Sequence, residues 1–293
     1  MNWQIINKEA FDFLEQQNYY QAQEKFKYNA KNNICGETLH NLGCFYMEEG
    51  LETQNHQTRS APFLGYHYLF HASMIFSHPL NHAALAMYHY NIKDYNKSCE
   101  YYKKISEREI TSEILYNYAV PCFFMQLYQK TVSTLNKAIQ KATKENLSKM
   151  ITLLIHGLLC TDHFGEAKEF IYPYIDIMDY DDQFILLFLL HEYDAAYKRI
   201  PFLYKYDLSF SELSMAIECA EYYYNFDIIK TLIKIKRDII TDISYKKIEC
   251  RKIISQIEGS KNSRKRFIDQ YRYIPSVIPI CYYIDCSNHN LTL

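Results

Sequence analysis

The stretch YNKSCEYYKKI, residues 95–105, is followed 33 residues later by YQKTVSTLNKA, residues 128–138, which repeats its pattern. Each copy begins with Tyr and has a small hydroxyl residue three positions later, Ser98 in the first and Thr131 in the second. Twelve residues before these lie Ala86 and Ala119. A fixed step of this length indicates stacked supersecondary units, and a pair of helices is a unit of this size.

The same spacing continues in both directions along the chain. The positions expected to lie where two helices approach closely are 22, 65, 98, 131, 167, 196 and 229, and all of them except Ile229 carry Ala, Gly, Ser or Thr. Large residues three and four positions away keep each set on one helical face. One step is about ten residues too long, and we place the surplus in an insertion at Gly50–Pro62. The sequence thus predicts successive helix pairs.

This arrangement resembles the tetratricopeptide repeat, whose signature has small residues at positions 8, 20 and 27 and an aromatic residue near position 11. The resemblance implies an all-α fold, a right-handed superhelical solenoid of about seven such helix pairs with a C-terminal cap. We expect the solenoid to cover residues 1–258, clearest over 5–175 and degenerate over 176–258. Residues 259–293 would form a basic and apolar cap or tail. The chain has only 7 Gly and 7 Pro, which is typical of helices joined by short connections.

The resemblance also implies a function, a non-enzymatic intracellular scaffold that binds a peptide or protein segment in the concave groove of the superhelix. Asn41 and Asn117 occupy the sixth repeat position, on the first helix of a pair, where Asn in this family often holds the main chain of a ligand. An amide suits this role because it donates and accepts hydrogen bonds at once. The alternative is two solvent-exposed Asn residues without a ligand. The expected peptide-binding residues are Asn41, Asn117, His40, His89, Tyr90 and Tyr116.

Two further functions remain open at this stage. One is a regulatory receptor for a short signalling peptide. The other is a nucleic-acid-binding adaptor, because Lys261, Arg264, Lys265 and Arg266 form a basic cluster that could contact phosphates. A cluster of this kind is also typical of the solvated face of a capping helix. With a net charge of −2, the chain as a whole does not favour a nucleic-acid partner.

The segment IPSVIPICYYI, residues 274–284, is apolar and contains two prolines, so it cannot form a regular helix. We expect it either to pack on the final helices or to lie extended in a groove.

The sequence lacks the signatures of other classes of protein. The nine Cys are scattered and odd in number, which favours reduced thiols and a cytoplasmic location. We expect no metal, because the pairs His67/His71 and His78/His82 lack a third ligand. We also expect no cofactor, no catalytic site and no membrane partner, while the oligomeric state stays open.

Overall fold

The computed structural model describes residues 2–48, 61–203, 210–242 and 273–286. Over these ranges the chain consists of α-helices, one 3-10 helix and an extended segment near the C-terminus, and it has no strand. The all-α helical-repeat architecture predicted from the sequence is confirmed. The chain divides into two compact units, one of residues 1–142 with 276–293 and the other of residues 143–275.

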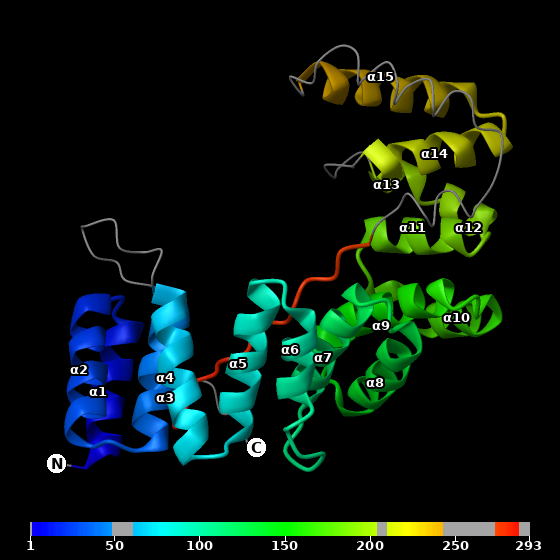
Figure 1. Ribbon diagram of the computed structural model, residues 1–293. Helices are drawn as coiled ribbons and strands as arrows, with labels where there is room; N and C mark the ends of the chain where they lie inside the picture. Colours follow the sequence, from blue (N-terminus) through cyan, green and yellow to red (C-terminus); the bar gives the residue numbers. More distant parts are fainter. Residues whose placement is uncertain (1, 49–60, 204–209, 243–272, 287–293) are drawn as a thin grey trace. The chain divides into compact units, whose positions relative to one another are not determined.

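The described helices of unit 1 form four pairs that follow one another in chain order (Figure 1). Their helices are α1 (Trp3–Glu15), α2 (Tyr19–Asn32), α3 (Gly36–Glu48), α4 (Ala61–Ile75), α5 (Pro79–Asn91), α6 (Tyr95–Tyr102), α7 (Ser112–Phe124) and α8 (Tyr128–Lys141).

Unit 2 continues the alternation with shorter and less regular helices. They are α9 (Lys144–Cys160), α10 (Phe164–Ile171), the 3-10 helix η1 (Tyr172–Ile177), α11 (Tyr180–Leu189), α12 (Tyr193–Tyr197), α13 (Ile200–Leu203), α14 (Phe210–Tyr222) and α15 (Phe226–Asp242). No helix within the described ranges is long and apolar enough to cross a bilayer.

The small residues of the repeat lie where helices touch. A Cβ atom on Gly43 of α3 would lie 3.1 Å from the carbonyl oxygen of Gly65 in α4, and one on Gly65 would lie 2.8 Å from that of Gly43. The two backbones are therefore in contact, which larger residues would prevent. Ala86, Ser98 and Thr131 are likewise fully buried. The register predicted from the sequence is confirmed at these positions.

The described turns between the two helices of a pair also follow the repeat. Six non-glycine residues, each five residues before a predicted close-contact position, have a left-handed backbone with φ between 53° and 63°: Gln17, Lys93, Gln126, Asp162, His191 and Tyr224. Around Lys93, the Asp94 N–H donates to the His89 carbonyl at 2.8 Å, and the Lys93 N–H donates to the Tyr90 carbonyl at 2.9 Å. This is the Schellman ending of a helix, which satisfies carbonyls left free in the last turn.

Three expectations fall partly outside the described ranges. Of the expected insertion at Gly50–Pro62, residues 50–60 are not described, whereas Ala61 and Pro62 begin α4. The basic cluster, which comprises Lys261, Arg264, Lys265 and Arg266, also lies outside them. Of the expected cap or tail at 259–293, only residues 273–286 are described, and residues 276–286 belong to unit 1.

Candidate functional site

The C-terminal segment of unit 1, residues 276–286, which we call the tail, is bound to the first helices of two pairs (Figure 1). It has no regular secondary structure, and it begins at α7 and ends at α3. Of the two arrangements expected from the sequence, packing on the final helices is wrong.

Helix α7 binds the start of the tail through two neighbouring residues. The Asn117 Nδ2 donates to the Ile278 carbonyl at 2.9 Å, and the Ile278 N–H donates to the Asn117 Oδ1 at 2.8 Å. One residue earlier, the Tyr116 hydroxyl donates to the Ser276 carbonyl at 2.9 Å. We call Tyr116 and Asn117 the α7 clamp. It pairs three main-chain groups of the tail.

Helix α3 binds the end of the tail in the same way. The Asn41 Nδ2 donates to the Ile284 carbonyl at 3.0 Å, and the Ile284 N–H donates to the Asn41 Oδ1 at 2.8 Å. The His40 Nε2 lies 2.6 Å from the Tyr282 carbonyl. We call His40 and Asn41 the α3 clamp. In both clamps the Asn pairs with one tail residue. The helix residue just before the Asn pairs with the tail residue two positions before that one.

The tail residues held by the clamps share one parity. Residues 276, 278, 282 and 284 present their main-chain groups to the helices. In an extended chain, alternate residues direct these groups to the same edge. Pro275 and Pro279, which have no N–H, fall at the other parity, where the helices require no donor. The tail sequence therefore fits an extended segment read along one edge.

The imidazole of His40 is neutral. Its side chain is fully buried, and burial lowers its pKa from 6.5 to about 4, while the bond to the Tyr282 carbonyl opposes this change and the charge of His78 adds to it. Because a carbonyl oxygen only accepts, Nε2 must carry the proton and donate it. The α3 clamp thus presents three groups without a net charge. Asn41 and Asn117 are fully buried too, so the alternative of solvent-exposed Asn residues is wrong.

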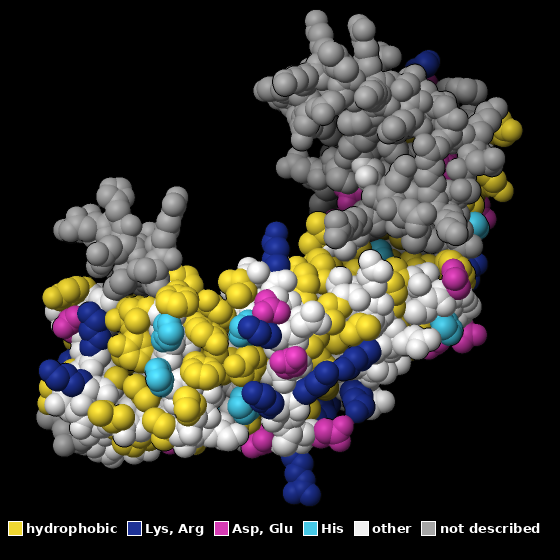
Figure 2. All heavy atoms as spheres, viewed as in Figure 1, with side chains coloured by type: hydrophobic (Ala, Val, Ile, Leu, Met, Phe, Trp, Pro, Cys, Tyr) yellow, Lys and Arg dark blue, Asp and Glu magenta, His cyan; other side chains and the backbone are white. Residues whose placement is uncertain are grey.

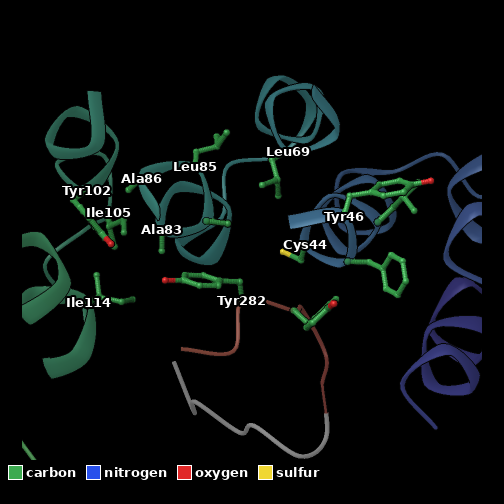
Figure 3. Close-up of a cluster of buried hydrophobic side chains, with 14 of the residues drawn as sticks. Cys44, Tyr46, Leu69, Ala83, Leu85, Ala86, Tyr102, Ile105, Ile114 and Tyr282 are labelled. Carbon is green, nitrogen blue, oxygen red and sulfur yellow. The ribbon is translucent and has the colours of Figure 1, made fainter. Parts of the chain in front are cut away.

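Side chains of the tail fill apolar space in unit 1. The Tyr283 ring stacks on Phe26 of α2 at 5.8 Å between centroids and meets Phe11 of α1 edge-on at 5.5 Å. The Tyr282 ring lies beside Ala83 of α5 and points toward Ile114 of α7 (Figure 3). The tail is therefore integrated into the hydrophobic core of the unit.

Four of the six residues expected at a peptide-binding site hold the tail: His40, Asn41, Tyr116 and Asn117. The other two pack elsewhere. His89 is buried and stacks on Tyr101 of α6 at 5.4 Å, and Tyr90 packs against Tyr95 at 5.8 Å. Both lie in the last turn of α5, and they contribute to the contact between α5 and α6.

Sequence reasoning missed the aromatic surroundings of Tyr283. Phe11 and Phe26 occupy the first pair, where they fit the hydrophobic pattern of any repeat. Two adjacent Tyr residues in an otherwise aliphatic tail were the available signal, since large aromatic side chains in such a segment need matching partners.

The histidine pairs His67/His71 and His78/His82 lie in α4 and at the start of α5. Within the described ranges, no group of three or more His, Cys, Asp or Glu residues could hold a metal ion. The His78 Nδ1 accepts a hydrogen bond from the Leu80 N–H at the start of α5, which is a capping role.

Two other surface features of unit 1 are less suited to binding a ligand. A cavity of about 490 Å³ carries several lysines, but Lys137 pairs with Glu107, and Lys141 donates to the Ile110 carbonyl. Figure 2 shows hydrophobic and histidine side chains gathered over α4, where Phe63 and Met74 are exposed. Nothing in the structure indicates what would cover that face.

Comparisons with known proteins agree with the fold. No family model and no curated protein matches the chain. Among solved structures, it is similar to a tetratricopeptide repeat protein from Parabacteroides merdae ATCC 43184, with 14% identity and a TM-score of 0.54, over 88% of this chain and 99% of that one. It is also similar to pilF of Pseudomonas aeruginosa, with 12% identity and a TM-score of 0.50, over 80% of this chain and 90% of that one. Identities this low show the fold alone, so the chain shares the helical-repeat fold of these tetratricopeptide repeat structures.

Proposed function

We propose that the chain is a non-enzymatic protein-interaction scaffold whose unit 1 binds an extended peptide segment through the α3 and α7 clamps. The observation that carries the proposal is the pairing of Asn41 and Asn117 with both main-chain groups of a tail residue. Recognition of an N–H and a carbonyl on one residue requires no particular side chain, so a segment from a partner can make the same bonds.

The chemistry of the clamps favours a neutral, apolar ligand. The four clamp side chains are two amides, a phenol and an imidazole that burial keeps neutral. The tail residues that they hold include Ile278 and Ile284, which are 3% and 7% exposed. A strongly charged partner such as nucleic acid would find no opposite charge here, which makes the nucleic-acid alternative less suited to this site.

The test uses a full-length chain in which the tail is expelled. In the tail variant, Ile278→Asp with Ile284→Asp places two charges at buried positions, where they are strongly disfavoured. A displayed library of random 14-residue peptides is selected on this variant. Each enriched peptide is then titrated against the tail variant and against the same chain with Asn41→Ala and Asn117→Ala added.

We expect enriched peptides to lose about 1–3 kcal/mol of binding free energy when both Asn residues are removed, because ligand main-chain groups are left unpaired. Asn96→Ala, on the exposed surface of α6, is the matched control and should change nothing. Circular dichroism must show that all three chains are folded. The proposal fails if no enriched peptide depends on Asn41 and Asn117.

A further inference from the structure

We propose that the partner supplies an extended segment with two apolar anchor residues six positions apart, the second preceded by an aromatic residue, and that this segment binds by displacing the chain's own tail. The inference rests on the proposed function and adds the pattern of the ligand and the competition with the tail.

The spacing of six follows from two periods that must agree. Packed helices lie about 8–10 Å apart, and an extended chain rises about 3.3 Å per residue, so about three ligand residues pass each first helix. Main-chain groups of an extended chain face the same edge at every second residue. Periods of three and two coincide after six residues, which is the distance from Ile278 to Ile284.

The helix between the clamps agrees with this account. At the two positions of α5 that correspond to the clamp residues, the chain has Ala83 and Ala84. The tail residue midway between the anchors is Cys281, whose parity is opposite to that of Ile278 and Ile284. Because alternate residues of an extended chain direct their main-chain groups to opposite edges, an amide on α5 would find no partner at Cys281.

The side-chain preferences follow from what the tail buries. Both anchors are buried isoleucines, and Tyr283, just before the second anchor, fits against Phe11 and Phe26. The engaged segment, residues 276–284, contains no charged residue, and the chain turns at Asp285, where φ is 60°. A partner segment therefore needs nine uncharged residues with this order of apolar and aromatic positions.

Competition follows because each clamp can pair with only one segment. The two Asn residues use their amide oxygen and nitrogen on the tail, and Tyr283 occupies the space between Phe11 and Phe26. A tethered segment has a high effective concentration at its own site, so it weakens the binding of any free segment. The tail acts as an internal copy of the ligand.

The first experiment measures competition with a defined probe. The probe is a dye-labelled peptide with the sequence of residues 273–286, in which Ser replaces both Cys residues to prevent thiol oxidation. Fluorescence anisotropy gives its affinity for the full-length chain and for the tail variant. We expect the tail variant to bind at least about tenfold more tightly, because the tethered competitor is absent. Full-length Ile284→Pro, which removes one main-chain donor without adding a charge, should shift the affinity in the same direction.

The second experiment tests the spacing with modified probes on the tail variant. N-methylation at the positions of Ile278 and Ile284 removes the N–H groups that the Asn residues accept, and should weaken binding at least about tenfold. N-methylation at the position of Val277, whose N–H faces the other edge, is the matched control and should have little effect. A probe that lacks Ile280 has anchors five residues apart and should also bind at least about tenfold more weakly, because one anchor then faces the wrong edge.

Each outcome decides a separate point. Equal affinity of the probe for the folded full-length chain, the tail variant and Ile284→Pro would overturn displacement, while library peptides that depend on Asn41 and Asn117 would leave the proposed function intact. Equal binding of the probes with spacing five and six would overturn the ligand pattern. Equal loss from N-methylation at Val277 and at the anchors would overturn it as well. Failure of every library peptide to depend on the two Asn residues would instead overturn the proposed function.

Discussion

Helices α3 and α7 differ from α5, which lies between them in chain order, at two equivalent positions. The first two carry His40–Asn41 and Tyr116–Asn117, which bind the tail, while α5 carries Ala83–Ala84. All three are first helices of a pair, and each packs against the second helix of its own pair. The difference teaches that the repeat sets where a side chain lies, whereas the two-residue period of the bound segment decides which repeats can bind its main chain.

The most damaging change to this arrangement should be the loss of both clamp amides. Asn41→Ala with Asn117→Ala leaves two N–H groups and two carbonyls of the tail unpaired in a buried site. At about 1–3 kcal/mol for each Asn, the free energy of unfolding of unit 1 should fall by about 2–6 kcal/mol. Hydrogen exchange at the amides of Ile278 and Ile284, followed by mass spectrometry, should become fast. If these amides stay protected, the clamps do not hold the tail.

Introducing an amide into α5 tests whether this helix could also bind the main chain of the tail. Ala84 is 3% exposed, so Ala84→Asn would bury an amide opposite a tail residue of the wrong parity. We expect the free energy of unfolding to fall by about 1–3 kcal/mol, the cost of an unsatisfied buried polar group. Urea denaturation measures it, with Ala84→Leu as a control for added volume. A more stable Ala84→Asn protein would show that α5 is also able to clamp.

The two clamps should also differ in their response to pH, because only the α3 clamp contains a histidine. Its pKa is about 4 in the folded protein, against 6.5 ordinarily, so the unfolded chain binds a proton first as the pH falls. The contribution of the neutral His40 imidazole to the free energy of unfolding is complete above pH 6.5 and is lost as the pH falls toward 4. Between pH 7 and pH 5 the free energy of unfolding should therefore fall by about 2 kcal/mol.

His40→Gln is the matched variant for this effect, since its amide can donate to the Tyr282 carbonyl without titrating. Denaturation curves at pH 7 and pH 5 should show a smaller difference for His40→Gln than for the unchanged chain. His156 in unit 2, whose pKa burial lowers to about 3, adds a background loss of the same sign to both proteins. An unchanged difference would show that His40 contributes nothing to the pH dependence.

Much of this architecture was predictable, because a helix pair leaves a strong periodic signal. Close contact admits only small residues, so Gly43 and Gly65 mark a helix contact in the sequence itself. Asn41 and Asn117 were predictable from their repeat position and the bonding capacity of an amide, and His40 and Tyr116 from their places beside them on the first helices. That Asn41 would bind Ile284 was not, because 243 residues separate them and nothing local links the two.

The turns were the other feature hidden from the sequence. A left-handed backbone usually calls for Gly or Asn, yet these positions carry Lys93, Gln126 and other residues with ordinary side chains. The Schellman bonds hold the geometry in place of the residue's own preference. Reasoning from residue type alone could not identify them, whereas their constant distance from the close-contact positions identifies them once one turn is known.

The smallest expected effect comes from these turns, and it should be the same on a helix with a clamp as on one without. Lys93 follows the C-cap of α5 and Gln126 follows that of α7, with φ of 63° and 60°. A left-handed non-glycine residue costs about 1–2 kcal/mol, and glycine relieves this at the expense of greater freedom in the unfolded chain. Lys93→Gly and Gln126→Gly should therefore each stabilise the protein by about 0.5–1 kcal/mol. Lys97→Gly, inside α6, is the control and should destabilise by about 1 kcal/mol.

Melting temperatures of the three variants measure these changes in stability. Equal gains at Lys93 and Gln126 would confine the difference between α5 and α7 to the face that meets the tail, whereas a gain at one turn alone would show that the two repeats also differ in their backbones.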